Sequence, residues 1–289
     1  MTPNRDRFYD GGTPTEPPDP SREPRISLIR IDDGGVERFR MGRRIAYRDR
    51  QYGELLVPPD LDTFVTDLTS VPTLFTWLVP KTGRYLPATL LHDGLVHGPH
   101  EPATYLSTDG HVLDRVEADR VLRTAMRDLE VGPVRGWLIW SAVTLGTIWS
   151  GDARWSRREH LRYLVPMLLS LGLVVVLGAI ATLDLFDVVS WLPWMGDRPT
   201  WLELVGGLAG AIVVPLVLGL TWGRFAIAGA VTGIALAVLL HATVLLAAIT
   251  GLYQAAERLA VRRPVGALVA GGAAVAASTA LTVLLTATQ

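Results

Sequence analysis

The sequence of 289 residues contains no cysteine, which excludes disulfide bonds, thiolate zinc sites and thiol catalysis. It also lacks a large excess of either charge, because its formal net charge is −1 at pH 7. No basic field therefore favours nucleic acid as a partner. Met1 is not followed by a basic segment and then an apolar one, so we expect no cleavable secretory signal.

Charged side chains are scarce in the second half of the chain. Only ten of the 55 charged residues lie within residues 163–289, where long apolar runs take their place. A helix needs about 20 apolar residues to cross the hydrocarbon core of a bilayer, and charge is penalised there. We therefore expect residues 152–289 to form an all-α transmembrane four-helix bundle. Its spans are predicted at residues 163–183, 201–222, 225–246 and 265–287.

The distribution of arginines predicts the orientation of these spans. Four arginines within residues 154–162 precede the first span, whereas the following loop carries three aspartates and one arginine. The positive-inside rule then places the N-terminal domain in the cytoplasm of a multi-pass protein of the plasma or inner membrane, with the lipid bilayer as its partner. The arginines within residues 258–263 would face outward, which the rule disfavours, so the topology of that loop stays open.

Small and aromatic residues predict how the spans pack. Gly206 and Gly210, like Gly229 and Gly233, have the GxxxG spacing that permits close contact between helices. Four tryptophans, Trp222 among them, lie at predicted span ends, as in an aromatic belt. One histidine, at position 241, lies well inside a predicted span, and we favour a neutral imidazole that is hydrogen-bonded to a helix neighbour.

The N-terminal part divides into an arm and a soluble domain. Residues 1–24 contain six prolines and few apolar side chains, which predicts a disordered arm. Residues 25–151 are predicted to form an α+β domain with a small sheet and a helical hairpin. Apolar spacing indicates hairpin helices over residues 85–96 and 114–129. The Trp-rich helix at 137–149 is too short to span comfortably and is expected in the core or near lipid headgroups.

A group of polar residues in this domain is the strongest candidate site. His92 and Asp93 are adjacent within an apolar helical run, where polar groups are costly unless they have partners. They point about 100° apart, so one edge of a helix can present both. Asp119 lies on the next helix, which can return to bring it opposite His92. Asp67 follows a short β-prone stretch and completes the group.

This region contains four ordered motifs, Phe64–Pro72, Gly83–Tyr85, Leu91–Asp93 and Glu117–Arg120. Together they resemble a known family, the one catalogued as domain of unknown function 1353, whose members occur in phages and bacteria. The resemblance covers about residues 36–150 and implies a fold, but no established activity. Gly94 departs from the family pattern, which more often has a bulky residue after His-Asp.

Three interpretations of the polar group stay open. Its His-Asp pair and facing aspartate resemble secreted and parvoviral phospholipases A2, which implies His92 as general base, Asp119 as its orienting partner and Asp93 as a Ca²⁺ ligand. A metal-dependent hydrolase, similar to phosphohydrolases of the HD type, would use Asp67, His92, Asp93 and Asp119 around Mn²⁺, Fe or Zn²⁺. In the third interpretation, the residues form a structural hydrogen-bonded network that ties the hairpin to the Asp67 loop.

The sequence as a whole favours a membrane-anchored accessory or interaction protein of bacterial or phage origin, with a membrane or phage protein as partner. The alternative is a membrane-apposed hydrolase, either phospholipase A2-like or a metal-dependent phosphohydrolase. In that alternative His92 and Asp119 are catalytic, Asp67 and Asp93 bind metal, and Ca²⁺ or another divalent ion is the cofactor. The sequence specifies neither a substrate nor an oligomeric state.

Overall fold

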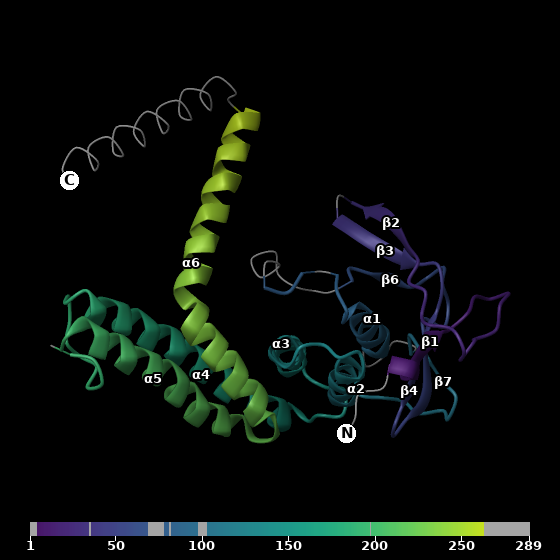
Figure 1. Cartoon of the computed structure of the whole chain (residues 1–289), viewed down its shortest axis with the longest axis horizontal. Helices are drawn as coiled ribbons and strands as arrows, with labels where there is room; N and C mark the ends of the chain where they lie inside the picture. The colour runs from purple at the N-terminus through teal and green to yellow at the C-terminus, as the bar shows by residue number, and fades with distance from the viewer. Residues whose placement is uncertain are drawn as a thin grey trace. The chain divides into compact units, whose positions relative to one another are not determined.

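The computed structural model describes residues 5–34, 36–68, 78–80, 82–97, 103–196 and 198–262. The chain divides into two compact units, residues 1–238 and residues 239–289. The small sheets and the helices that the sequence predicts for the N-terminal part are present in the first unit (Figure 1).

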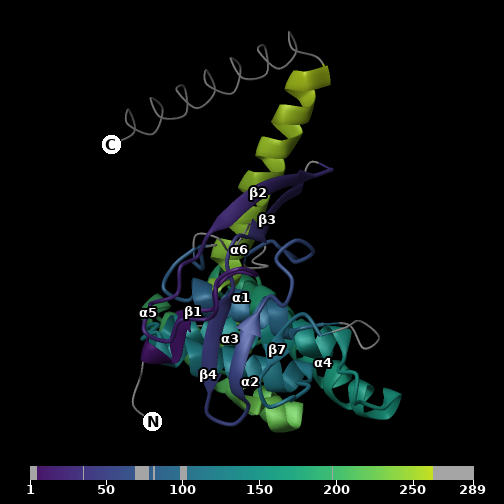
Figure 2. The same ribbon diagram turned by 90° about the vertical axis from the view of Figure 1, so that its right-hand side faces the viewer.

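A four-stranded antiparallel sheet forms one face of the N-terminal domain. In spatial order its strands are β1 (Phe8–Asp10), β4 (Ile45–Asp49), β5 (Gly53–Val57) and β7 (Leu106–Ser107). The carboxylate of Asp49 closes the β4–β5 hairpin by accepting the backbone N–H groups of Gln51 and Tyr52 at 2.8 and 3.1 Å. Figure 2 views the domain from the side of this sheet, with the helices behind it.

A second sheet of three strands positions part of the candidate site. It contains β2 (Leu28–Asp33), β3 (Val36–Met41) and β6 (Val65–Thr66), in that spatial order. In the antiparallel β3–β6 pair, Phe39 lies opposite Thr66. This register fixes Thr66 and the adjacent Asp67 beside the hairpin of β2 and β3.

The described part of this domain contains three α-helices, of which the first two pack on the first sheet. They are α1 (Leu86–Leu95), α2 (Arg115–Asp128) and α3 (Pro133–Ser150). α2 begins with a capping box, in which Asp114 accepts the N–H of Glu117 at 2.7 Å and Glu117 accepts the N–H of Asp114 at 2.8 Å. α1 packs on β5 and on α2, and α2 packs on α3, so leucines of α1 and α2 fill one shared core.

Gly94 is the point of closest approach between α1 and β5. A Cβ atom at this position would overlap the side chain of Val57 on β5. The departure of Gly94 from the family pattern therefore has a packing reason, because only glycine lets the helix lie this close to the strand.

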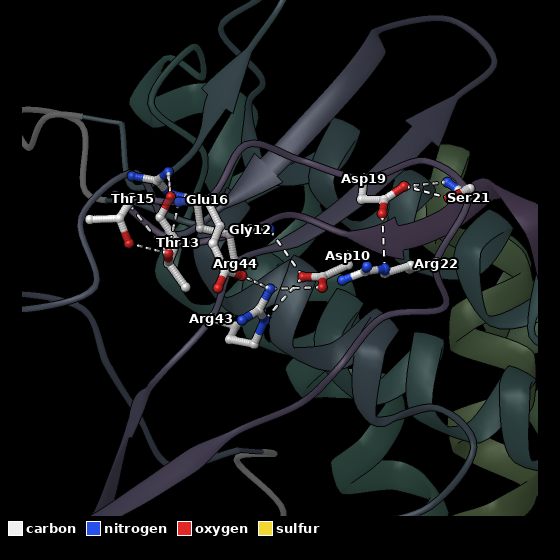
Figure 3. A network of polar contacts seen from close by, with 10 residues as sticks. All are labelled: Asp10, Gly12, Thr13, Thr15, Glu16, Asp19, Ser21, Arg22, Arg43 and Arg44. Carbon is white, nitrogen blue, oxygen red and sulfur yellow. Dashed lines mark hydrogen bonds and ion pairs between the residues drawn. The ribbon is translucent and has the colours of Figure 1, made fainter.

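The prediction of a disordered arm over residues 1–24 is wrong for the part that the structure describes. Phe8 and Tyr9 are buried in β1, which pairs with β4. Prolines and few apolar residues suggested too little burial, but polar contacts hold this segment (Figure 3). Arg43 donates to both carboxylate oxygens of the buried Asp10 at 3.2 and 2.8 Å, and Gly12 N–H donates at 3.0 Å. Residues 1–4 lie outside the described residues.

The pKa of Asp10 reflects the same contacts. Burial of the carboxyl acts to raise this pKa, but the hydrogen bonds from Arg43 and Gly12 outweigh burial and lower the pKa below its usual value. Asp10 is therefore an ionised anchor that joins the arm to the segment between β3 and β4.

A second buried carboxylate joins the sheet to α2. Asp128, which is fully buried, accepts two hydrogen bonds of 2.8 Å from Arg50 and one of 2.9 Å from the Tyr47 hydroxyl. Burial, and then the charge of Asp128, raises the pKa of Tyr47, so its hydroxyl stays a donor. A buried pair of this kind contributes little net stability, but breaking one side leaves an uncompensated charge.

Replacement of Asp128 by Asn should therefore lower the free energy of unfolding by about 3 kcal/mol. The exposed pair between Arg48 and Glu54, also joined at 2.9 Å, supplies the control. Glu54→Gln should cost less than about 1 kcal/mol because solvent screens this pair. Denaturant unfolding of the full chain in neutral detergent, followed by tryptophan fluorescence, measures both. Equal costs for the two substitutions would contradict the assignment.

The helices after the soluble domain are long and apolar. They are α4 (Arg157–Leu185), α5 (Thr200–Gly219), a 3₁₀ segment η3 (Leu220–Phe225) and α6 (Ala226–Arg262). Two helical stretches among the described residues, 157–185 and 200–258, are long and apolar enough to cross a membrane by length and composition. Few of their apolar side chains are buried, unlike those of a core helix in a soluble protein.

The predicted four-helix bundle is therefore supported only in part. The second stretch joins α5 to α6 through η3, where Gly223 has φ 60° and breaks the helix. The predicted spans 163–183, 201–222 and 225–246 fall on these helices. The fourth, 265–287, lies outside the described residues.

Of the two predicted GxxxG contacts, one is present between α5 and α6, and the other glycine pair faces a loop instead of a helix. A Cβ at Gly229 would lie 2.6 Å from the Trp222 indole, and one at Gly233 would lie 2.8 Å from Pro215 of α5. Gly206 and Gly210, in contrast, face Trp194 of the α4–α5 loop. The second GxxxG spacing therefore joins two helices, whereas the first accommodates a loop.

Trp222 does not lie in an aromatic belt, contrary to the sequence prediction. Its side chain is buried, and its indole N–H donates to Ser170 Oγ of α4 at 2.8 Å. The indole contributes to a small core with Ile148 of α3, Met167 of α4 and Phe225. This core packs the soluble domain against the turn between α5 and α6.

Replacement of Ser170 by Ala should cost about 1 kcal/mol, because it leaves the buried indole N–H without an acceptor. In a Trp222→Phe background, which has no donor, the same replacement should cost close to nothing. A double-mutant cycle on thermal unfolding of the full chain in detergent measures the difference. An identical cost in both backgrounds would rule out the hydrogen bond as the cause.

Candidate functional site

The helices α1 and α2 bring two of the predicted site residues into contact. His92 Nε2 lies 2.8 Å from Asp119 Oδ1, so the expectation that α2 returns Asp119 to a position opposite His92 is confirmed. A carboxylate oxygen accepts, so Nε2 carries the proton of the neutral imidazole. The lone pair of that tautomer is therefore on Nδ1, the ring nitrogen away from Asp119.

The two members of this pair differ in burial. The Asp119 side chain is 4% exposed and the His92 side chain is 16% exposed. Among the described residues, Asp119 Oδ2 has no hydrogen-bond partner and no residue forms a hydrogen bond with His92 Nδ1. A buried carboxylate that orients a partly exposed imidazole is compatible with general-base catalysis and with a structural link.

Asp93 makes a separate contact on the other side of the polar group. Its carboxylate is hydrogen-bonded to the Thr66 hydroxyl of β6, and Thr66 Oγ1 accepts the N–H of Leu68 at 2.8 Å. Leu68 has φ 73°, which turns the chain after β6 so that its N–H points back at Thr66. These two hydrogen bonds attach the end of β6 to α1.

The electrostatics of Asp93 follow from its burial. Desolvation raises the pKa of Asp93 above its ordinary value of 3.8, and the nearby charge of Asp67 adds to the increase. The hydrogen bond from Thr66 and the charge of His92 oppose the shift without cancelling it. Asp93 thus binds a proton more tightly in the folded state than in the unfolded chain.

Of the predicted group of four, His92 and Asp119 are joined at 2.8 Å, and Asp93 lies within electrostatic reach of both Asp67 and His92. In the described parts of the chain, no three His, Asp or Glu side chains are grouped so that they could hold a metal ion. The metal-binding role of Asp67 and Asp93 stays a prediction. The loop that follows Asp67, residues 69–77, lies outside the described residues.

The loop histidines have aromatic neighbours. The ring of His97 lies 6.2 Å from that of Tyr105, and the ring of His111 lies 5.4 Å from that of Tyr52. His100 falls outside the described residues.

Thr66 is the site residue that sequence reasoning did not identify. It is buried and supplies the donor that an aspartate within an apolar helix needs. The sequence did contain a signal for Thr66. A buried carboxylate needs a nearby hydrogen-bond donor, and Thr66 directly precedes the site residue Asp67.

The comparisons with known proteins agree with the motif-based resemblance. Residues 39–143 match a family model described as Protein of unknown function (DUF1353). The resemblance predicted from the four motifs is confirmed over these residues. The match contains β4, β5, α1 and α2, and hence His92, Asp93 and Asp119, whereas the helices from Arg157 onward lie outside it. Searches of curated proteins and of solved structures gave no match.

The raised pKa of Asp93 predicts a pH-dependent effect of Asp93→Asn. The folded state holds the proton more tightly, so the carboxyl favours folding below its unfolded pKa of about 3.8. This contribution is lost as the pH rises through the raised folded pKa. An Asn side chain can still accept from Thr66, so the stability of the variant relative to wild type should increase from pH 4 upward and then level off.

Thermal unfolding of the full chain in detergent between pH 4 and 8 measures this difference. Asp67→Asn supplies the control, because removal of its charge reduces the pKa shift of Asp93. In the Asp67→Asn background, Asp93→Asn should therefore give a smaller pH-dependent gain. A difference between variant and wild type that is constant over the pH range would contradict the interpretation.

Proposed function

We propose that the chain is a multi-pass membrane protein whose N-terminal domain faces the cytoplasm and carries a His-Asp general base for ester hydrolysis. The exposed apolar side chains of α4, α5 and α6 support the membrane location, because such surfaces are solvated by lipid rather than water. The arginines at the start of α4 support the cytoplasmic side.

The contact between His92 and Asp119 carries the proposal for catalysis. Asp119 accepts a hydrogen bond from Nε2–H of His92. The lone pair of His92 Nδ1 is then available to take a proton from water. The resulting hydroxide attacks a carboxylic or phosphoric ester, and His92 returns the proton to the leaving oxygen. Asp119 acts as a positioning residue, since it fixes the imidazole tautomer and stabilises the imidazolium that forms.

Asp93 has a different role in this proposal from the one implied by the resemblance to phospholipases A2. Its carboxylate is bonded to Thr66 and favours the protonated form more than an exposed aspartate does. We assign Asp93 to the attachment of α1 to β6.

A second candidate function is the membrane-anchored accessory or interaction protein. The hydrogen bond between Asp93 and Thr66 supports this candidate, because it joins α1 to β6. In that case the His92–Asp119 pair is a further structural link, and Nδ1 of His92 takes no part in a reaction.

Replacement of His92 by Asn distinguishes the two functions. The hydrolase proposal expects a loss of at least about 100-fold in turnover with the fold retained, because the base is gone. Asp119→Asn should also reduce turnover, since the amide can bind the wrong tautomer of His92. Full-length protein in lipid nanodiscs is assayed with phosphatidylglycerol, p-nitrophenyl butyrate and bis-p-nitrophenyl phosphate, and circular dichroism monitors the fold.

Asp93→Asn is the matched control, because it alters a neighbouring carboxyl that does not contact the proposed base. It should retain turnover within about threefold of wild type, which is less than 1 kcal/mol in transition-state energy. Absence of hydrolysis by wild type on every substrate, or turnover that survives His92→Asn, would favour the accessory function.

A further inference from the structure

Basic residues from two distant segments converge at one end of the long helices. Arg158 and Arg162 lie one turn apart on the first turns of α4, and Arg224 lies in η3 between α5 and α6. All three are exposed, and none forms an ion pair with a carboxylate among the described residues. Sequence separation hides this cluster, because more than 60 residues lie between its two parts.

Arg224 is held in place by aromatic rings rather than by a carboxylate. Its guanidinium carbon lies 4.9 Å from the ring centre of Phe225, 5.1 Å from that of Trp155 and 5.2 Å from that of Tyr163. The rings also contact one another, with centres 5.1 Å apart for Trp155 and Tyr163 and for Tyr163 and Phe225. Such a cage orients the guanidinium and leaves its N–H donors available.

The small core beneath this cage keeps it in position. Phe225 and Trp222 are buried against Ile148 of α3 and Met167 of α4, and Tyr163 and Trp155 pack on the same core. His160 adds a contact of 2.9 Å between its Nε2 and the carbonyl oxygen of Ile148. The arginine cluster therefore rests on a rigid support at the junction of the soluble domain with the helices.

The carboxylate of Glu159 lies within electrostatic reach of Arg224 and Arg162. Hydrogen bonds from Ser156 are the main reason that the pKa of Glu159 is lowered, and the charges of Arg224 and Arg162 add to this effect. Glu159 already accepts the N–H and hydroxyl of Ser156 in the helix cap, at 2.9 and 3.0 Å. Arg224 and Arg162 both act on this anion, and Arg158 lies one turn before Arg162, so positive charge exceeds negative charge in the cluster.

We propose that Arg158, Arg162 and Arg224 form a binding site for the phosphate of an anionic phospholipid headgroup. Guanidinium groups bind phosphate through paired hydrogen bonds, and a preoriented guanidinium loses less entropy on binding. Trp155 and Tyr163 are the residue types that lie at the level of headgroups. The proposal rests on the proposed membrane location, which puts this end of α4 at the cytoplasmic leaflet, but not on the proposed hydrolysis.

Calorimetric titration of the full-length protein in neutral detergent tests the site. The probes are dihexanoylphosphatidylglycerol, dihexanoylphosphatidylcholine and inorganic phosphate. Wild type should bind the phosphatidylglycerol more tightly than the other two. Arg224→Gln should weaken that binding about fivefold, the usual effect of one basic residue near a charged lipid surface. The double variant Arg158→Gln with Arg162→Gln should weaken it at least as much, and it leaves the aromatic cage intact.

Arg198→Gln is the matched control, because Arg198 is an exposed arginine in the α4–α5 loop, at the other end of α4. It should leave phosphatidylglycerol binding unchanged. Equal affinity of wild type and the double variant, or equal affinity for the two lipids, would overturn the proposal. Equal binding of inorganic phosphate would overturn the assignment to lipid. Flotation of wild type with phosphatidylcholine vesicles is measured in parallel, so a failure of membrane anchoring is recognised separately.

Discussion

An ionised carboxylate inside a protein must be surrounded by donors, and this constraint determines how the segments of the chain are joined. Asp10 draws the N-terminal arm onto Arg43, and Asp128 draws the β4–β5 hairpin onto α2. Asp184 does the same at the end of α4, where its two oxygens accept N–H groups of the following loop at 3.0 Å. Each link costs desolvation and returns little net stability, but it allows only one arrangement of the segments it joins.

The candidate site follows the same logic with one exception. Asp93 is satisfied by Thr66, as the other buried carboxylates are by their partners. Asp119, by contrast, is buried with a single partner among the described residues, and that partner is an imidazole with an exposed edge. A carboxylate that is incompletely satisfied and coupled to a titratable ring is costly for a purely structural link, which is why a chemical role is the more economical explanation.

Sequence periodicity was sufficient to predict the helical hairpin, and the spacing of polar residues within it predicted the contact between His92 and Asp119. Both signals are local or involve neighbouring elements, where helix geometry restricts what can meet. The sequence did not reveal that the proline-rich arm is ordered, because its stability comes from contacts with Arg43, 33 residues beyond Asp10. It also misplaced Trp222, since burial of that ring depends on how α3, α4 and α6 meet.

The uninterrupted length of α6 has a consequence for the membrane topology proposed above. Its 37 residues extend over about 55 Å, whereas the hydrocarbon core is about 30 Å thick. Even at a tilt of 40°, the largest commonly observed, the core accommodates about 26 helical residues. In that proposed topology, about ten residues of α6 exceed what the core can hold, and the C-terminal end of the helix carries Glu257 and Arg258.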